Sequence, residues 1–398
     1  MKIVSLGGSG EDSRNCFLIE SSNYNILLDC GVRREIAEVS HVYPHLSEEI
    51  VRRLDAVIIS HAHEDHTAAL PYLYELGYRK DIYAHPETIK NIPSFLRKWA
   101  DYVEDNGGIL PFDKENIEKL QFKPLEELDL DISYGRNAHI IGGLWYLIRL
   151  DGHRILFTGD ITFDSLLLEN DPLPEADVLI IDSAYAGKVI NQYEQYDQLA
   201  DIARNTRGRL LLPVPANGRG IDMFEYLKGR IDNLYVEKNI LNNSEKLFEK
   251  TAWLKDFRRN DGSYTVVTDE IRNSDISGTY LFGDGMMTTE IAHTYFNTVK
   301  DDPDSRVIIT GHSAKGTLAN NLLNNDYIKE YDIKLQASRL TIKVHLDEAD
   351  VLKAIEQVKP EKVMLFHSQK KNCASLMKEL KKRKIDAVCD IDTPLIID

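Results

Sequence analysis

Short apolar runs alternate with polar loops along the first half of the chain. Such runs, rich in β-branched residues, predict strands at residues 3–6, 16–20, 24–28, 54–59, 82–84, 131–134, 145–150, 154–157 and 177–181. Helical periodicity predicts helices at residues 67–76 and over most of residues 87–128. This alternation predicts an α/β layered fold with functional groups gathered along one edge of the sheets.

The pattern changes after about residue 188 and changes again near residue 339. Between these points we expect a second α/β domain, with helices near residues 193–204 and 221–228 and strands at 210–214, 279–282 and 307–310. The tail predicts a strand, a helix, a strand and a helix at residues 340–344, 348–358, 362–366 and 374–383.

Composition and cysteine usage narrow the class of protein. The chain has 398 residues, enough for about two domains, and its apolar and charged fractions are ordinary for a globular protein. The amino terminus soon becomes Gly-rich and acidic, and no apolar run is long enough to span a bilayer. The four cysteines, at positions 16, 30, 373 and 389, lack Cys-x-x-Cys spacing. We therefore expect a soluble cytoplasmic protein with reduced thiols and no membrane partner.

The net charge of -16 argues against a nucleic-acid binder that works through a general basic surface. It leaves room for a local cleft, because bound metal ions would neutralise several of the acidic groups.

The strongest chemical signal is the loop at residues 60–66, which follows one predicted strand and precedes a helix. His61 and His63 alternate with an alanine, so in extended backbone they project to the same side and can hold one ion. Asp65 and His66 begin the next turn and can hold a second ion. A single surface histidine would usually be structural, but four donors in one short loop favour a metal site. Zinc suits this mixture of imidazole and carboxylate.

Further acids and histidines stand at or near predicted strand ends. A zinc held by two histidines needs a third protein ligand, and His139 is the candidate. Asp160 follows another strand and could bridge two ions about 3.5–4 Å apart. Asp29 could be a turn residue, but beside a metal loop we expect it to orient a ligand imidazole. The remaining residues at strand ends are Asp182, His345 and His367.

Two glycine-rich loops in the second domain, at residues 214–220 and 311–318, each follow a strand and precede a helix. That arrangement presents backbone N–H groups to an anion such as phosphate, although either loop could be a plain connection. The candidate phosphate-binding residues are Gly218, Arg219, Ser313, Lys315, Gly316 and Thr317.

Taken in order along the chain, these residues resemble the motifs of the β-CASP group of metallo-β-lactamase-fold nucleases, which includes polyadenylation-factor endonucleases and RNase J. The matching residues are Asp29, His61, His63, Asp65, His66, His139, Asp160, Asp182, His345 and His367. The resemblance implies an αββα sandwich formed by residues 1–187 and 340–398, with a β-CASP domain inserted at residues 188–339.

The resemblance also implies a two-zinc hydrolase. One zinc would bind His61, His63 and His139, the other Asp65, His66 and His367, with Asp160 shared. Asp65 would thus belong to the catalytic centre together with His345, which donates a proton, and Asp182, which holds it. The expected products are a 5′-phosphate and a 3′-hydroxyl.

The resemblance implies single-stranded RNA as the partner, because members that process RNA carry a histidine at the position of His367. The alternatives are a DNA nuclease, a metallo-hydrolase of a small ester, thioester or lactone, and a catalytically silent scaffold. The resemblance is compatible with internal cleavage and with cleavage from the 5′ end, and with a homodimer. It names no protein partner.

Overall fold

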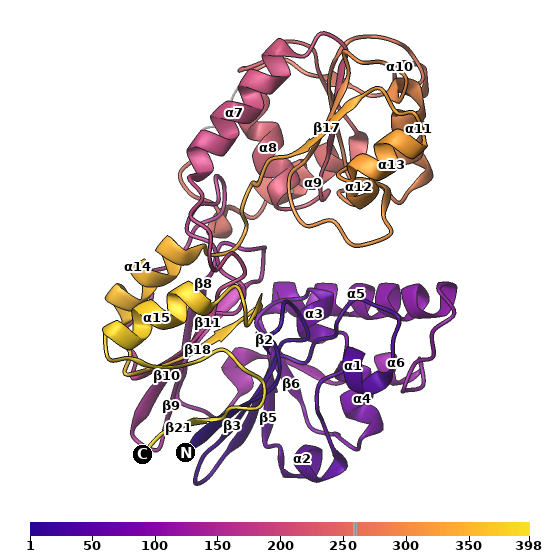
Figure 1. The fold of residues 1–398 in the computed structure, drawn as a ribbon. Coiled ribbons are helices and arrows are strands. Elements are labelled where there is room, and N and C mark those ends of the chain that lie inside the picture. Colours follow the sequence, from indigo (N-terminus) through magenta and orange to yellow (C-terminus); the bar gives the residue numbers. More distant parts are fainter. Residues whose placement is uncertain (258, 260) are drawn as a thin grey trace. The chain divides into compact units, whose positions relative to one another are not determined.

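The computed structural model describes residues 1–257, 259 and 261–398. The chain divides into two compact units (Figure 1). The first contains Met1–Phe163, Asn170–Val189 and His345–Asp398, and the second contains Asp164–Glu169 and Ile190–Val344. The chain therefore passes into the second unit twice, briefly at residues 164–169 and then for residues 190–344, and returns to the first unit each time.

Two mixed sheets form the centre of the first unit. The spatial order of the larger sheet is β21 (Leu395–Ile396), β1 (Lys2–Gly7), β3 (Cys16–Glu20), β4 (Asn25–Leu28), β5 (Ala56–Ile58), β6 (Ile82–Ala84) and β7 (Phe122–Pro124). The order of the other is β20 (Asp386–Val388), β18 (Lys362–Phe366), β11 (Val178–Asp182), β10 (His153–Phe157), β9 (Leu144–Leu150) and β8 (Ile132–Arg136). A short ribbon pairs β2 (Ser9–Gly10) with β19 (Ser368–Gln369).

The helices of this unit cover the outer faces of the two sheets. On the larger sheet lie α1 (Val39–Val42), α2 (Glu48–Arg53), α3 (Glu64–Thr67), α4 (Leu70–Glu75), α5 (Pro86–Asp105) and α6 (Asn116–Lys119), with a 3-10 turn at Leu125–Glu127. On the other sheet lie α14 (Glu348–Val358) and α15 (Ala374–Lys382).

The two sheets of this unit pack face to face. The ring of Phe17 on β3 lies 5.7 Å from that of Phe157 on β10 and 5.2 Å from that of Phe366 on β18. All three side chains are buried, and burial of aromatic surface at these distances stabilises the contact between sheets. The result is the αββα sandwich expected from the sequence.

Helix α14 shows why the local sequence folds as predicted. Its apolar residues Val351, Ile355 and Val358 recur at helical spacing and are buried against the smaller sheet. Asp347 and Asp350 form a capping box at its start, which satisfies two backbone N–H groups that the helix leaves unpaired.

The second unit contains a six-stranded parallel sheet with helices around it. The order of the sheet is β14 (Thr265–Val266), β13 (Leu234–Val236), β15 (Gly278–Phe282), β12 (Arg209–Pro213), β16 (Arg306–Ile309) and β17 (Gln336–Arg339). Its helices are α7 (Gln192–Asn205), α8 (Arg219–Leu227), α9 (Lys238–Phe248), α10 (Asp269–Arg272), α11 (Glu290–Val299), α12 (Leu318–Asn321) and α13 (Asn325–Glu330), with a 3-10 turn at Thr251–Trp253.

Two local predictions were wrong. Residues 340–344 are not a strand, because the backbone N–H and C=O of Lys343 bond to the side chain of Gln192 instead of to a neighbouring strand. The helix expected at residues 67–76 is two short helices, α3 and α4, and the first begins inside the histidine loop. The region 87–128 is mostly helical, as predicted, and it also contains strand β7, which joins the edge of the larger sheet beside β6.

No helix among the described residues is long and apolar enough to cross a membrane.

Candidate metal centre

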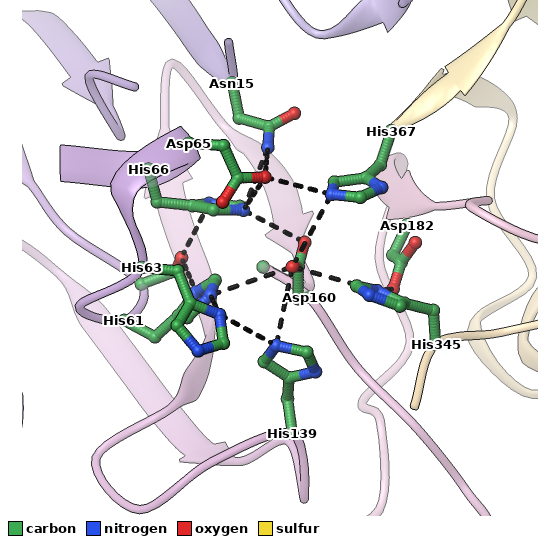
Figure 2. Close-up of polar contacts among 12 residues, drawn as sticks. Asn15, His61, His63, Asp65, His66, His139, Asp160, Asp182, His345 and His367 are labelled. Atoms are coloured by element: carbon green, nitrogen blue, oxygen red, sulfur yellow. Dashed lines mark hydrogen bonds and ion pairs between the residues drawn. The ribbon is translucent and has the colours of Figure 1, made fainter. Parts of the chain in front are cut away.

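The metal-ligand candidates of the first unit converge at one end of its two sheets (Figure 2). The loop after β5 carries four of them, Asp160 follows β10, and His367 follows β18 directly. Three groups of donors form among the described residues, and in each group the ligand atoms lie within 4.8 Å of one another. The first group is His61, His63, His139 and Asp160, and the second is Asp65, His66, His367 and Asp160. The third consists of the pair Asp182 and His345 together with His367, which it shares with the second group.

In the first group, three imidazoles point ring nitrogens at one another. His63 Nδ1 lies 3.0 Å from His61 Nε2 and 3.2 Å from His139 Nε2. Asp160 Oδ2 lies 3.7 Å from His61 Nε2 and 3.6 Å from His139 Nε2. Lone pairs brought this close repel one another unless a proton or a cation lies between them, so this donor set fits a metal ion.

In the second group, carboxylates alternate with imidazoles. Asp65 Oδ2 lies 3.0 Å from His367 Nε2 and 3.6 Å from His66 Nε2. Asp160 contributes its other oxygen, Oδ1, at 3.1 Å from His66 Nε2. Asp160 therefore faces both groups, which is the geometry of a bridging carboxylate.

Asp29 holds His66 from behind. It is fully buried, and its Oδ2 lies 2.6 Å from His66 Nδ1, so it accepts the Nδ1–H and leaves Nε2 directed at Asp160. The backbone N–H and the hydroxyl of Ser60 each donate to Asp29 at 2.7 Å. These bonds fix the carboxylate, which in turn fixes the ring and its tautomer.

His345 and Asp182 form a pair beside the first two groups. His345 Nδ1 lies 2.9 Å from Asp182 Oδ2, while its distance to Asp160 Oδ2 is 3.7 Å. Asp182 is buried and accepts hydrogen bonds from the backbone N–H groups of Ile161 and Ala184. The carboxylate is therefore immobile and sets the orientation of the imidazole.

Asn15 is a site residue that the sequence reading missed. Its Nδ2 lies 3.2 Å from Asp65 Oδ2 and 2.9 Å from His66 Nε2, so it contacts two residues of the second group (Figure 2). A single asparagine before a strand carries no recognisable motif, and only the position of β3 beside the histidine loop reveals it.

Left-handed backbone is concentrated at the site. Asp29, Ala138 and His367 have φ values of 58°, 58° and 63°, and Gly159, which precedes Asp160, has a φ of 52°. Non-glycine residues rarely adopt this conformation, which costs about 1–3 kcal/mol each. Here it turns the chain sharply after a strand so that the side chain, or the one that follows, faces the centre.

Burial and neighbouring charges shift the pKa values of the site histidines in opposite directions. Burial lowers the pKa of His61 well below its ordinary value, and the neighbouring His66 and His63 lower it further, so His61 is neutral and offers a lone pair. Burial also opposes charge on His66 and His367, but carboxylates including Asp160 and Asp65 outweigh it. They raise the pKa of His66 well above its ordinary value and that of His367 to about 10.

Cation binding should therefore release protons. The carboxylates that raise the pKa of His66 and of His367 favour the protonated rings, and a cation must displace a proton from each ring to reach its nitrogen. Affinity should rise with pH, about tenfold per pH unit for each proton released. Calorimetric titration with zinc in buffers of different ionisation enthalpy would count the protons. An affinity unchanged between about pH 6 and pH 8 would contradict this account.

The variant Asp29→Asn should bind the second cation about 10- to 100-fold more weakly. Asparagine tolerates the left-handed backbone at this position but removes the charge that polarises His66. Competition with a chromogenic chelator would measure the loss, with Asp129→Asn at an exposed position as the matched control. Equal affinities for the two variants would exclude an orienting role for Asp29.

The phosphate-loop candidates lie in the second unit, where three of them already have structural partners. Arg219 donates a hydrogen bond to the carbonyl of Ile342 at 3.2 Å. The Ser313 hydroxyl is buried and accepts a hydrogen bond from Arg339 at 2.6 Å, and the Thr317 side chain caps α12. A Cβ added to Gly311 would lie 2.2 Å from the Arg219 guanidinium, so the two glycine-rich loops meet at this point. Gly218 and Gly316 have positive φ values, and a Cβ on Gly316 would meet open space.

The αββα sandwich, with histidines and aspartates gathered at one end of its two sheets, is the scaffold of a metal-dependent hydrolase. The metallo-beta-lactamase superfamily model matches residues 9–211, more than half of the chain, and the chain belongs to this superfamily. This confirms the family and the fold expected from the sequence.

Among characterised proteins, the chain is 25% identical to the transcription termination factor FttA of Methanothermobacter thermautotrophicus, over 92% of this chain and 66% of that protein. It is 24% identical to an RNase J-like protein of Methanocaldococcus jannaschii, over 92% and 91% of the two chains. It is also 24% identical to the endoribonuclease ysh1 of Schizosaccharomyces pombe, over 97% of this chain and 57% of that protein. The chain thus spans less than two thirds of two of these three relatives.

The same fold occurs in a crystal structure of a protein of unknown function from Enterococcus faecalis V583. The TM-score is 0.64 at 14% identity, over 100% of this chain and 99% of the other. The agreement extends over both units of the chain.

Proposed function

We propose that this protein is a ribonuclease that uses two zinc ions to hydrolyse phosphodiester bonds of single-stranded RNA. The observation that carries the proposal is the position of Asp160, whose two oxygens face two donor groups, with the pair of His345 and Asp182 beside them. The relatives named as ribonucleases support RNA as the substrate class.

The first ion would bind His61, His63 and His139, and the second would bind Asp65, His66 and His367, with Asp160 shared. Imidazole-rich donor sets of this kind suit zinc. When bound, the pair of ions acidifies a water molecule and offsets charge on the phosphoryl oxygens.

The other residues would position the metal ligands or transfer a proton. Asp29 and Asn15 hold the second donor group in place. Asp182 keeps the Nδ1 of His345 occupied, so its Nε2 is the atom that would carry the proton for the leaving 3′-oxygen. The products would be a 5′-phosphate and a 3′-hydroxyl. In the second unit, the glycine-rich loops with Arg219 and Lys315 would bind phosphate groups.

The decisive experiment compares cleavage of an end-labelled single-stranded RNA with cleavage of DNA of the same sequence. The zinc-loaded protein should cut the RNA, and His63→Ala should not. The fragment ladder would distinguish internal cutting from progress along the strand from its 5′ end. Cleavage of DNA alone would assign the protein to the DNA nucleases. Zinc at the site without cleavage of either strand would favour a small-molecule hydrolase, and absence of stoichiometric zinc would favour a scaffold.

A further inference from the structure

One face of helix α5 combines aromatic, amide and cationic side chains at helical spacing. Asn91, Phe95, Lys98 and Tyr102 follow one another at intervals of four, three and four residues, which places them on one side of the helix. Asn91 and Lys98 are exposed, whereas the two rings are half-buried. We call these four residues the α5 stripe. The core-facing side of α5 is formed by other residues, including Ile92, Leu96, Trp99 and Val103.

The α5 stripe begins at the metal centre. The ring of Phe95 lies 5.6 Å from that of His63, at an interplanar angle of 72°. Phe95 therefore contacts a proposed metal ligand in a T-shaped arrangement of the two rings. Helix α3, which carries Asp65 and His66, packs beside α5 (Figure 1). From Phe95 to Tyr102 the helix advances about 10 Å along its axis.

A cationic side chain lies near each of the rings of Phe95 and Tyr102. Lys98 Nζ lies 5.4 Å from the centroid of the Phe95 ring. The Arg34 guanidinium lies 4.8 Å from the centroid of the Tyr102 ring, and Arg34 also bonds to Glu64 at 2.8 Å. More than half of the Arg34 side chain remains exposed, so its charge is available to solvent.

The acids near the far end of α5 have cationic partners. Asp101 and Glu104 both bond to Lys114, at 3.0 Å and 2.9 Å. The one lysine offsets one of these two carboxylate charges, and Glu64 offsets the charge of Arg34. Lys98 therefore supplies the positive charge of the α5 stripe.

We propose that the α5 stripe, together with Arg34, binds the single-stranded RNA next to the scissile phosphate; the inference rests on the proposed ribonuclease function. Unpaired bases would stack on Phe95 and Tyr102, because aromatic rings accept any base by its π face. Lys98 and Arg34 would contact the phosphates between these bases. Duplex RNA offers no free base faces and would bind poorly.

The test uses two variants away from the metal ligands, Tyr102→Leu and Lys98→Ala, in the full-length zinc-loaded protein. Each should raise the KM for a single-stranded RNA about tenfold, and by more than it changes kcat. Lys98→Ala should also reduce the slope of log Kd against log salt by about 0.7, the value for one phosphate contact on a single strand.

Lys90→Ala is the matched control, because Lys90 is an exposed lysine on the same helix, about 80° around the axis from Lys98. Its KM and salt slope should equal those of the unmutated protein. If Tyr102→Leu unfolds at a lower temperature, Lys98→Glu provides the same test without loss of a ring.

Unchanged KM and salt slope in all stripe variants, in a protein that cuts RNA, would overturn this inference and leave the ribonuclease proposal standing. A protein that does not cut RNA at all would refute the ribonuclease proposal, and this inference with it. A tenfold rise in KM confined to the stripe variants would support both.

Discussion

Replacing Asp160 by asparagine is expected to abolish RNA cleavage and to leave the protein with less than its full complement of metal. The carboxylate is buried, and its two oxygens face the two donor groups at 3.1–3.7 Å. An amide of the same shape carries no charge and offers one oxygen in place of two. Loss of several kcal/mol of charge stabilisation corresponds to a decrease of about a thousandfold or more in kcat/KM.

Metal analysis of the purified variant, followed by single-turnover cleavage, would test this prediction. Asp131→Asn, at an exposed position in the same unit, is the control and should behave as the unmutated protein does. Full metal content in Asp160→Asn together with full activity would show that Asp160 does not bridge the two groups.

His345→Ala is expected to retain both metals but to lose most of its turnover. His345 contacts the buried Asp182 at 2.9 Å and lies 3.7 Å from the nearest oxygen of Asp160, so its removal leaves the two donor groups complete. Removal of a general acid typically costs about 10²- to 10⁴-fold in rate. Stoichiometric zinc and a kcat reduced by this factor are therefore expected together.

The role of His345 can be separated from simple structural damage by changing the leaving group. In an RNA whose scissile 3′-oxygen is replaced by sulfur, the leaving thiolate needs no proton, so the defect of His345→Ala should shrink. Asp182→Asn should show the same pattern in weaker form, because it disturbs only the orientation of the imidazole. His293→Ala, at an exposed position, is the control. An equal defect on both substrates would exclude proton donation by His345.

Sequence patterns predicted the structure correctly wherever the residues that determine it lie close together in the chain. Helix α14 follows from its apolar spacing and its capping box, and strands β9, β11 and β18 follow from short apolar runs. The histidine loop could also be recognised as a candidate metal site from the sequence, because four potential ligands fall within six residues. The family and the layered fold could be predicted from these features and their order.

Local sequence failed where distant segments decide the outcome. Residues 340–344 have the composition of a strand, but the side chain of Gln192, far away in the chain, takes both backbone hydrogen bonds of Lys343. Strand β7 exists because the edge of β6 offers unpaired backbone groups. Asn15 contacts the site only because β3 lies beside the histidine loop.

The sequence by itself determined which residue types are present, in what order, and which of them stand at strand ends. The order of the motifs, through the resemblance they carry, also implied that His139, Asp160 and His367 join the histidine loop and that Asp182 holds His345. The tertiary structure alone decided the distances between these groups and the contacts of Asn15 with Asp65 and of Phe95 with His63. The physical reason is that helical and strand periodicity act over a few residues, whereas a site is built from distances between strand ends. Those distances are set by sheet order and by sharp left-handed turns such as those at Asp29 and His367.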